Sequence, residues 1–143
     1  MPQNYLAIDY GERRIGIAFA CGSVGIAFPR ETIDLSKKSL WVELERLVKE
    51  NKITDFVLGL PIHPNNHPDS KQKTVEMFAD ELHAKFPQIE LHIQDESYST
   101  QEAITMIGGQ IKNKERIDKA AATIILQRFL EGSFKCRSTQ MKQ

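Results

Sequence analysis

Three acidic residues that lie far apart in the chain, Asp9, Glu96 and Asp118, could share one chemical task. Asp9 ends a short apolar run, Glu96 follows a run of alternating apolar and polar residues, and Asp118 precedes the apolar stretch that begins at Ala120. Carboxylates at the ends of strands can converge on a divalent cation, because hard ions such as Mg²⁺ take oxygen ligands. The pattern therefore predicts a metal site suited to phosphodiester chemistry.

Hydrolysis of a phosphodiester needs an activated water, stabilisation of the developing charge and an activated leaving oxygen. Two divalent ions about 4 Å apart can serve all three needs. We therefore expect Mg²⁺ or Mn²⁺, bound as two ions, with Asp9 as the central ligand because a strand end in the middle of a sheet is held rigidly. Each carboxylate taken singly also fits an ordinary role, such as a helix cap for Asp118, so the prediction depends on the three together.

Several residues near these carboxylates could contact phosphate groups. Gly11 leaves room for a backbone or a phosphate to approach closely, and the guanidinium of Arg14 suits a phosphate oxygen. Ser99 stands at a predicted helix start, where phosphates can bind, although helix capping explains this serine as well. A surface charge on a strand explains Arg14 equally well. A basic connector supplies three further candidates for holding a phosphate backbone: Lys112, Lys114 and Arg116.

The elements that must position these residues follow from periodicity and turn signals. Closely spaced strands over 4–9, 15–20 and 26–33, joined by turns that contain glycine, predict an antiparallel meander. Helices and strands then alternate. Two strands are predicted over 56–60 and 89–94. Four helices are predicted: one from Ser36 to Lys52 with Ser36 as its cap, one from Ser70 to Phe86, one from Ser99 towards Ile107, and a last one from Asp118 to about Leu130.

This order predicts an α/β fold, a mixed five-stranded sheet with helices on both faces. In such sheets, sites gather at the carboxyl ends of the strands, where Asp9 and the pair Asp95 and Glu96 lie. The length of 143 residues fits a single domain, with a core over about 4–132 and a flexible tail over 133–143.

Charge is distributed unevenly along the chain. The formal net charge is zero, but residues 110–143 carry eight basic and three acidic residues, a net of +5. This end could hold a nucleic-acid backbone, and solvated helix faces without a partner explain the same charges equally well.

The sequence also bears on location and assembly. No apolar stretch approaches the roughly 20 residues that span a bilayer, and the first residues lack the features of a signal peptide. We expect a cytoplasmic protein with no membrane partner, a nucleic-acid substrate, and a monomeric or homodimeric state.

Four segments resemble motifs of the YqgF/RuvX family, and they occur in the family's order over about residues 4–132. Residues 9–16 resemble its opening motif, and residues 59–61 resemble its central strand-to-loop element. Residues 95–100 resemble its acidic segment, and residues 117–127 are similar to its closing helix. Ser97 stands where the family pattern has arginine.

The resemblance implies a ribonuclease H-like fold and a bacterial nuclease that matures the 5′ end of pre-16S rRNA, or one that resembles a Holliday junction resolvase. It also implies that Asp9, Glu96 and Asp118 are the metal ligands. The choice of Glu96 over Asp95 rests on the resemblance, because alternation along the strand lets either residue face the site.

Two alternatives to a nuclease acting on structured RNA remain open. Resolution of branched DNA would use the same carboxylates, and symmetric cutting of two strands favours a two-fold dimer. A non-catalytic RNA-binding factor for ribosome assembly would fit the neutral net charge and Ser97.

Overall fold

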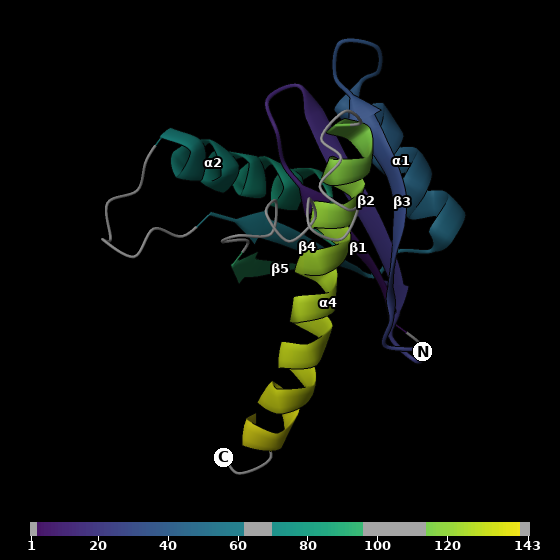
Figure 1. Ribbon diagram of the computed structural model, residues 1–143, viewed down its shortest axis with the longest axis vertical. Helices are drawn as coiled ribbons and strands as arrows, with labels where there is room; N and C mark the ends of the chain where they lie inside the picture. The colour runs from purple at the N-terminus through teal and green to yellow at the C-terminus, as the bar shows by residue number, and fades with distance from the viewer. Residues whose placement is uncertain (1–2, 62–69, 96–113, 141–143) are drawn as a thin grey trace.

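The computed structural model describes residues 3–61, 70–95 and 114–140. Five strands form one mixed sheet in the order β3-β2-β1-β4-β5 (Figure 1). β1 pairs with β2, and β2 with β3, in antiparallel fashion, whereas β1, β4 and β5 run parallel to one another. This arrangement confirms the predicted sheet. The strands are β1 (Asn4–Asp9), β2 (Arg14–Cys21), β3 (Ala27–Asp34), β4 (Asp55–Leu60) and β5 (Glu90–Asp95).

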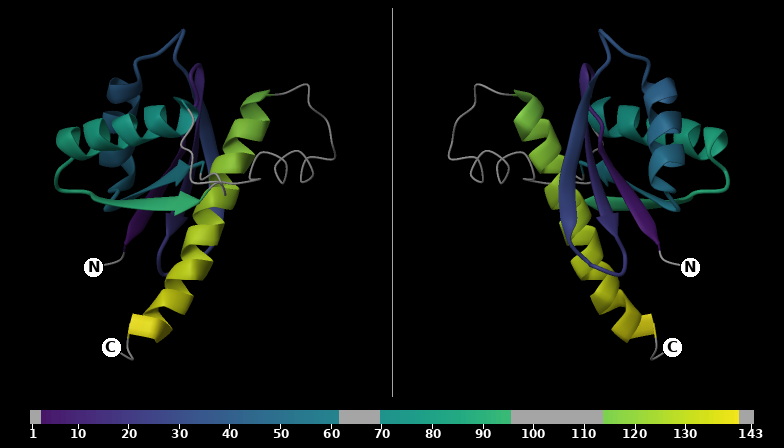
Figure 2. Two further views of the ribbon diagram at one scale, coloured as in Figure 1. Left: turned by 90° about the vertical axis from the view of Figure 1, so that its left-hand side faces the viewer. Right: turned by 90° about the vertical axis from the view of Figure 1, so that its right-hand side faces the viewer.

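Helices cover both faces of the sheet, as predicted. α1 (Leu40–Asn51) and α2 (Ser70–Lys85) lie on one face, and α4 (Lys114–Gln140) crosses the other (Figure 2). Because side chains alternate along a strand, those of β1 pack in two separate cores, one on each face of the sheet. Leu6 and Ile8 pack on the α1–α2 side, and Tyr5 and Ala7 pack on the α4 side. None of the described helices is both long and apolar enough to cross a membrane.

The start of α1 differs from the prediction. Ser36 does not cap the helix, which begins at Leu40 with Ser39 at the N-cap position. The backbone N–H and the hydroxyl of Ser36 instead donate to Asp34 Oδ1, at 3.0 and 2.6 Å. These hydrogen bonds lower the pKa of the Asp34 carboxyl and form a local turn, which competes with helix at this point.

The last helix also differs from the prediction at both ends. α4 begins at Lys114 and continues to Gln140, past the predicted end near Leu130. Asp118 therefore lies one turn inside the helix and is not its cap. The flexibility expected over 133–143 stays a prediction, and the helix expected from Ser99 lies outside the described residues.

α4 and β2 approach each other closely because the facing side of β2 carries small residues. A Cβ atom added to Gly16 would lie 2.1 Å from the backbone oxygen of Asp118 and 3.3 Å from its Cα, so no side chain fits there. Further along the strand, Ala18 and Ala20 pack with Ala122, Ile125 and Leu126 of the helix. The position of Asp118 above the sheet is thus fixed by a contact between two backbones.

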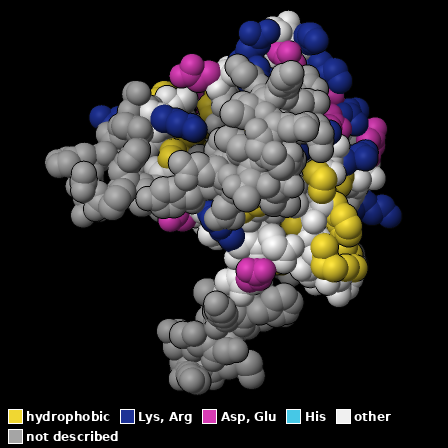
Figure 3. Space-filling view, in the orientation of Figure 1, with side chains coloured by type: hydrophobic (Ala, Val, Ile, Leu, Met, Phe, Trp, Pro, Cys, Tyr) yellow, Lys and Arg dark blue, Asp and Glu magenta, His cyan; other side chains and the backbone are white. Residues whose placement is uncertain are grey.

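The outer strand β3 and the turn that precedes it leave several apolar side chains exposed. Val24 and Ile26 in the turn and Phe28 in the strand are more than half exposed, at 57%, 52% and 55%. Apolar side chains gather on the side of the molecule that carries β3 (Figure 3). Pro29 has no N–H to donate, and the pairing of β2 with β3 shifts register at Ile17/Ala18. Proline and bulges of this kind hinder the addition of a further strand to a sheet edge.

Gly16→Ala should lower the free energy of unfolding by about 1–3 kcal/mol, because the added methyl group meets backbone that cannot rotate away. Gly132→Ala is the matched control, since a Cβ atom at Gly132 meets nothing within 4 Å. Replacing a helical glycine by alanine should leave stability unchanged or raise it by up to about 1 kcal/mol. Urea denaturation of both variants measures the difference, and equal stabilities would show that α4 does not depend on Gly16.

Candidate active site at the end of the central strand

Asp9 occupies the position that the sequence predicts, at the end of the central strand. β1 lies between β2 and β4, and Asp9 is its last residue. Because β1, β4 and β5 are parallel, their carboxyl ends meet at one edge of the sheet, and Asp95 ends β5 at this edge. Sites in sheets of this kind are usually built at that edge.

Asp118 lies near Asp9 because its backbone contacts Gly16. Asp9 and Gly16 are direct partners across β1 and β2, and the backbone of Asp118 lies on Gly16. Paired Cα atoms in an antiparallel ladder are about 4.5–5.5 Å apart, so the Cα atoms of Asp9 and Asp118 lie within roughly 10 Å of each other. Two carboxylates at this separation can reach one ion or two neighbouring ions.

The side of the sheet that Asp9 faces follows from alternation along β1. Tyr5 and Ala7 belong to the core under α4, so Asp9, two residues on, faces α4 as well. Arg14 and Gly16 alternate in the same way with Ala18 and Ala20 of that core. Asp9, Arg14 and Asp118 therefore share the α4 face.

Arg14 pairs with Asp118 rather than standing alone. Its Nε donates to Asp118 Oδ2 at 3.1 Å, and each side chain is 24% exposed. The bond joins the first residue of β2 to the second turn of α4 across 104 positions of sequence. The guanidinium partly neutralises the Asp118 carboxylate, which limits the repulsion between two carboxylates on one face.

Asp95 lies at the same edge but on the other face. It pairs with Leu60 of β4, and Leu60 packs against the core under α1 and α2. Residues directly paired across neighbouring strands point to the same face of the sheet. The Asp95 side chain is therefore directed away from the face that Asp9 and Asp118 share.

A further acidic residue, Asp55, is buried at the opposite end of the sheet and has a structural role. His92 Nε2 lies 2.8 Å from Asp55 Oδ2, and the Thr54 hydroxyl donates to Oδ1 at 2.6 Å. His92 also packs against the ring of Phe129 in α4, with ring centroids 4.7 Å apart. A buried carboxylate with partners on both oxygens ties β4, β5 and α4 together.

The predicted phosphate contacts are described only in part. Gly11 lies in a tight turn, where a Cβ atom would come 2.4 Å from the backbone oxygen of Arg14. Glu96, Ser99 and Lys112 lie outside the described residues. Two further candidates, Lys114 and Arg116, belong to α4, but their side chains are outside the described part.

The role of Gly16 was not predicted from the sequence. The sequence placed it in a strand and at the end of the opening motif, but glycine inside a strand also often marks a close approach of another backbone. That signal could have identified the contact, but it does not say which helix approaches.

The described part of the site offers oxygen ligands of the kind that Mg²⁺ and Mn²⁺ prefer. Within residues 3–61, 70–95 and 114–140, no group of three or more acidic, histidine or cysteine side chains could hold a metal ion. Asp9 and Asp118 thus form two thirds of the predicted ligand set, and Glu96, the remaining ligand, is outside these ranges.

Comparisons with known proteins agree with this fold. A relative from Francisella tularensis subsp. tularensis (strain WY96-3418), named "Putative pre-16S rRNA nuclease", is 32% identical over 135 residues, which cover 91% of this chain and 98% of the relative. A relative of the same name from Opitutus terrae is 32% identical over 134 residues, covering 90% and 92%.

Two solved structures share the fold at low sequence identity. The Thermus thermophilus RuvC in complex with a Holliday junction substrate aligns with a TM-score of 0.54 at 10% identity, over 92% of this chain and 96% of that one. The yeast mitochondrial Holliday junction resolvase Ydc2 aligns with a TM-score of 0.56 at 11% identity, over 90% and 78%. The sheet is therefore ribonuclease H-like.

A family model provides the assignment. The model described as "RuvX: Holliday junction resolvase" matches residues 3–132, which include every described strand and the part of α4 that packs on the sheet. With the two relatives above, this match shows that the chain belongs to the RuvX family.

Proposed function

We propose that the protein is a metal-dependent nuclease that hydrolyses phosphodiester bonds at the carboxyl edge of its sheet. The observation that carries the proposal is the approach of Asp118 to Asp9, made possible by Gly16. Two acidic side chains on one face, half-buried and beside a guanidinium, are poorly explained by packing alone. Membership of the RuvX family and the names of the relatives support a nuclease.

Glu96 is the proposed third ligand, in preference to Asp95. Asp95 points to the α1–α2 face because it pairs with Leu60. Asp95 is therefore a poor candidate for a ligand beside Asp9 and Asp118, which leaves Glu96 as the proposed ligand from this acidic pair. The direction of the Asp95 side chain favours Glu96 independently of the family motif.

Mg²⁺ or Mn²⁺, as two ions, would be held by Asp9, Glu96 and Asp118. Such ions, when bound, activate a water and stabilise the charge that develops on the phosphate. Arg14 limits the charge repulsion within the site, and the guanidinium nitrogens other than Nε are proposed to contact a phosphate oxygen. Gly11 keeps the turn after Asp9 tight. The proposed contacts further along the phosphate backbone are Ser99, Lys112, Lys114 and Arg116.

The proposed substrate is an rRNA precursor, cleaved at the 5′ end of pre-16S rRNA in the cytoplasm. The names of the two relatives favour this substrate. A four-way DNA junction is the second candidate, because the matched family model is described as a Holliday junction resolvase and the RuvC structure holds that substrate. A resolvase should act as a two-fold dimer, whereas the RNA reaction is compatible with a monomer.

Asp9→Asn should lower the cleavage rate at least about 100-fold, because a neutral amide is a poor ligand for a hard cation. Labelled RNA carrying the 5′ extension of 16S rRNA and a labelled four-way DNA junction are incubated in parallel with Mg²⁺, Mn²⁺ or EDTA. Cleavage of the RNA with either metal, and none in EDTA, is the expected result for the wild type.

The same experiment decides between the candidate functions. Unchanged cleavage by Asp9→Asn would rule out the proposed site. Cleavage of the junction alone would select the resolvase. Binding of RNA with no cleavage of either substrate would favour an assembly factor that is not an enzyme.

Glu96→Gln and Asp95→Asn form a matched pair, since each removes one charge from neighbouring positions. Glu96→Gln should lower cleavage at least about 100-fold, whereas Asp95→Asn should retain cleavage within about threefold of the wild type. Single-turnover cleavage over a range of Mn²⁺ concentrations measures both the rate and the affinity for the metal. The reverse pattern would assign the third ligand to Asp95.

Arg14→Gln should lower cleavage roughly tenfold, because it removes the partner of Asp118 and the proposed phosphate contact. The adjacent Arg13→Gln is the control, since Arg13 is exposed and its backbone oxygen, rather than its side chain, accepts the hydrogen bond from Leu35. Both variants remove one positive charge from the same turn. Equal losses in the two variants would indicate a general effect of charge and exclude a specific role for Arg14.

A further inference from the structure

A pocket of about 290 Å³ opens next to the turn that follows Asp9, on the α2 side of the sheet edge. This volume lies near the lower limit of roughly 300–1,000 Å³ that small-molecule sites occupy, so it suits one planar group rather than a helix or a duplex. The pocket is lined by Tyr10, Gly11, Glu12, Lys71, Thr74 and Val75.

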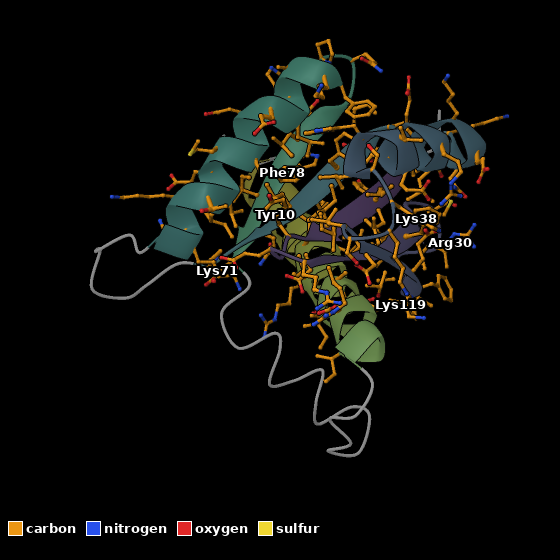
Figure 4. All side chains as sticks on the ribbon, turned by 90° about the horizontal axis from the view of Figure 1, so that it is seen from above. Tyr10, Arg30, Lys38, Lys71, Phe78 and Lys119 are labelled. Carbon is orange, nitrogen blue, oxygen red and sulfur yellow. The ribbon has the colours of Figure 1, made fainter. Side chains whose placement is uncertain are left out.

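One wall of the pocket is an aromatic ring that is already held in position. The ring of Tyr10 stacks on that of Phe78 with centroids 4.4 Å apart and planes at 28°, and Phe78 stacks on Trp41 at 5.6 Å and 29°. Phe78 is buried, whereas Tyr10 is half-buried at the end of the stack (Figure 4). Since the ring is fixed before any ligand arrives, a planar ligand could pack against it without the cost of ordering a side chain.

The other walls combine donors and acceptors of hydrogen bonds. Lys71 is exposed near the start of α2 and has no ion pair within the described part of the chain, and Thr74 adds a hydroxyl one turn later. Glu12 contributes an exposed carboxylate from the turn. A carboxylate at the wall disfavours a phosphate inside the pocket, whereas the edge of a nucleobase has both donors and acceptors.

The pocket lies next to the candidate active site in the chain but on the other face of the sheet. Tyr10 directly follows Asp9, and consecutive Cα atoms are about 3.8 Å apart. Asp9 faces α4, whereas Tyr10 packs with the core under α1 and α2. A nucleic-acid strand with a phosphate at Asp9 would only need to cross the sheet edge to bring a neighbouring base to Tyr10.

We propose that this pocket binds one unpaired base of the substrate strand, next to the phosphate at Asp9, by stacking on Tyr10. The proposal rests on the proposed nuclease function and adds to it a preference for a strand with an unpaired nucleotide at the cleavage site. A base held in a duplex cannot reach the pocket, because it remains stacked between its neighbours.

The test is a binding experiment in EDTA, so that its result does not depend on cleavage. The probes are a fluorescein-labelled single-stranded 12-nucleotide RNA and a duplex of the same sequence. Tyr10→Leu should weaken binding of the single strand by roughly 5- to 100-fold, the usual effect of losing one stacked base. Binding of the duplex should stay within twofold of the wild type, and Tyr10→Phe, which keeps the ring, should bind both probes like the wild type.

A second variant guards against a change in the fold. Thr74→Leu narrows the pocket from the exposed side of α2 while keeping all three aromatic residues, and it should cause a similar selective loss. Thermal unfolding confirms that each variant is folded. The proposal would be overturned if a variant lost affinity equally for the single strand and the duplex. It would also be overturned if one or both of Tyr10→Leu and Thr74→Leu bound the single strand as tightly as the wild type.

The failure of this inference can be told apart from failure of the nuclease function. If the wild type cleaves RNA but the two pocket variants bind both probes normally, the nuclease stands and the pocket does not hold a base. If the wild type cleaves nothing but shows the selective loss in both variants, the pocket is a base-binding site in a protein that is not a nuclease.

Discussion

The candidate site depends on the contact between the backbone of α4 and the backbone of β2 at Gly16. Any side chain at this position would hold the helix away from the sheet, because the Asp118 carbonyl occupies the space that a Cβ atom would need. The small side chains of the alanines further along β2 let the rest of the helix pack close to the sheet. The contact at Gly16 that positions α4 on the sheet therefore also sets the distance between Asp118 and Asp9. The stability of the fold and the geometry of the candidate site depend on the same contact.

The two faces of the sheet have different proposed roles at the site. Alternation along β1 sends Asp9 to the α4 face and directs Tyr10 to the α1–α2 face. One strand end thus presents a carboxylate on one side and an aromatic ring on the other. The carboxylate side suits a cation and a phosphate, and the aromatic side suits a planar group, so adjacent parts of a nucleotide chain would meet matching chemistry at a single edge.

Charged side chains have different roles at the site and elsewhere. Arg14 holds one carboxylate of the candidate site and is itself half-buried, so the pair carries both a structural and a chemical role. Arg46, by contrast, joins α1 to β3 through Glu31 and also pairs with Glu43 of its own helix. Its hydrogen bonds to these two carboxylates raise the pKa of its guanidinium. The buried pair of Asp55 and His92 stabilises the opposite end of the sheet. Acidic residues alone therefore do not identify the site, and their position relative to the strand ends does.

The sequence by itself determined the order of the elements, the mixed sheet and the position of Asp9 at the end of a strand, because hydrophobic periodicity and turn residues act over a few positions. It also carried the motifs that place the chain in its family. It did not locate the start of α1 or the ends of α4. At the start of α1, the side chain of Asp34 accepts hydrogen bonds from Ser36 that compete with the helix. Only the tertiary structure decided that Arg14 pairs with Asp118, that Gly16 brings α4 onto the sheet and that Asp95 faces away from Asp9. Each of these depends on contacts between residues far apart in the chain, and local patterns do not encode such contacts.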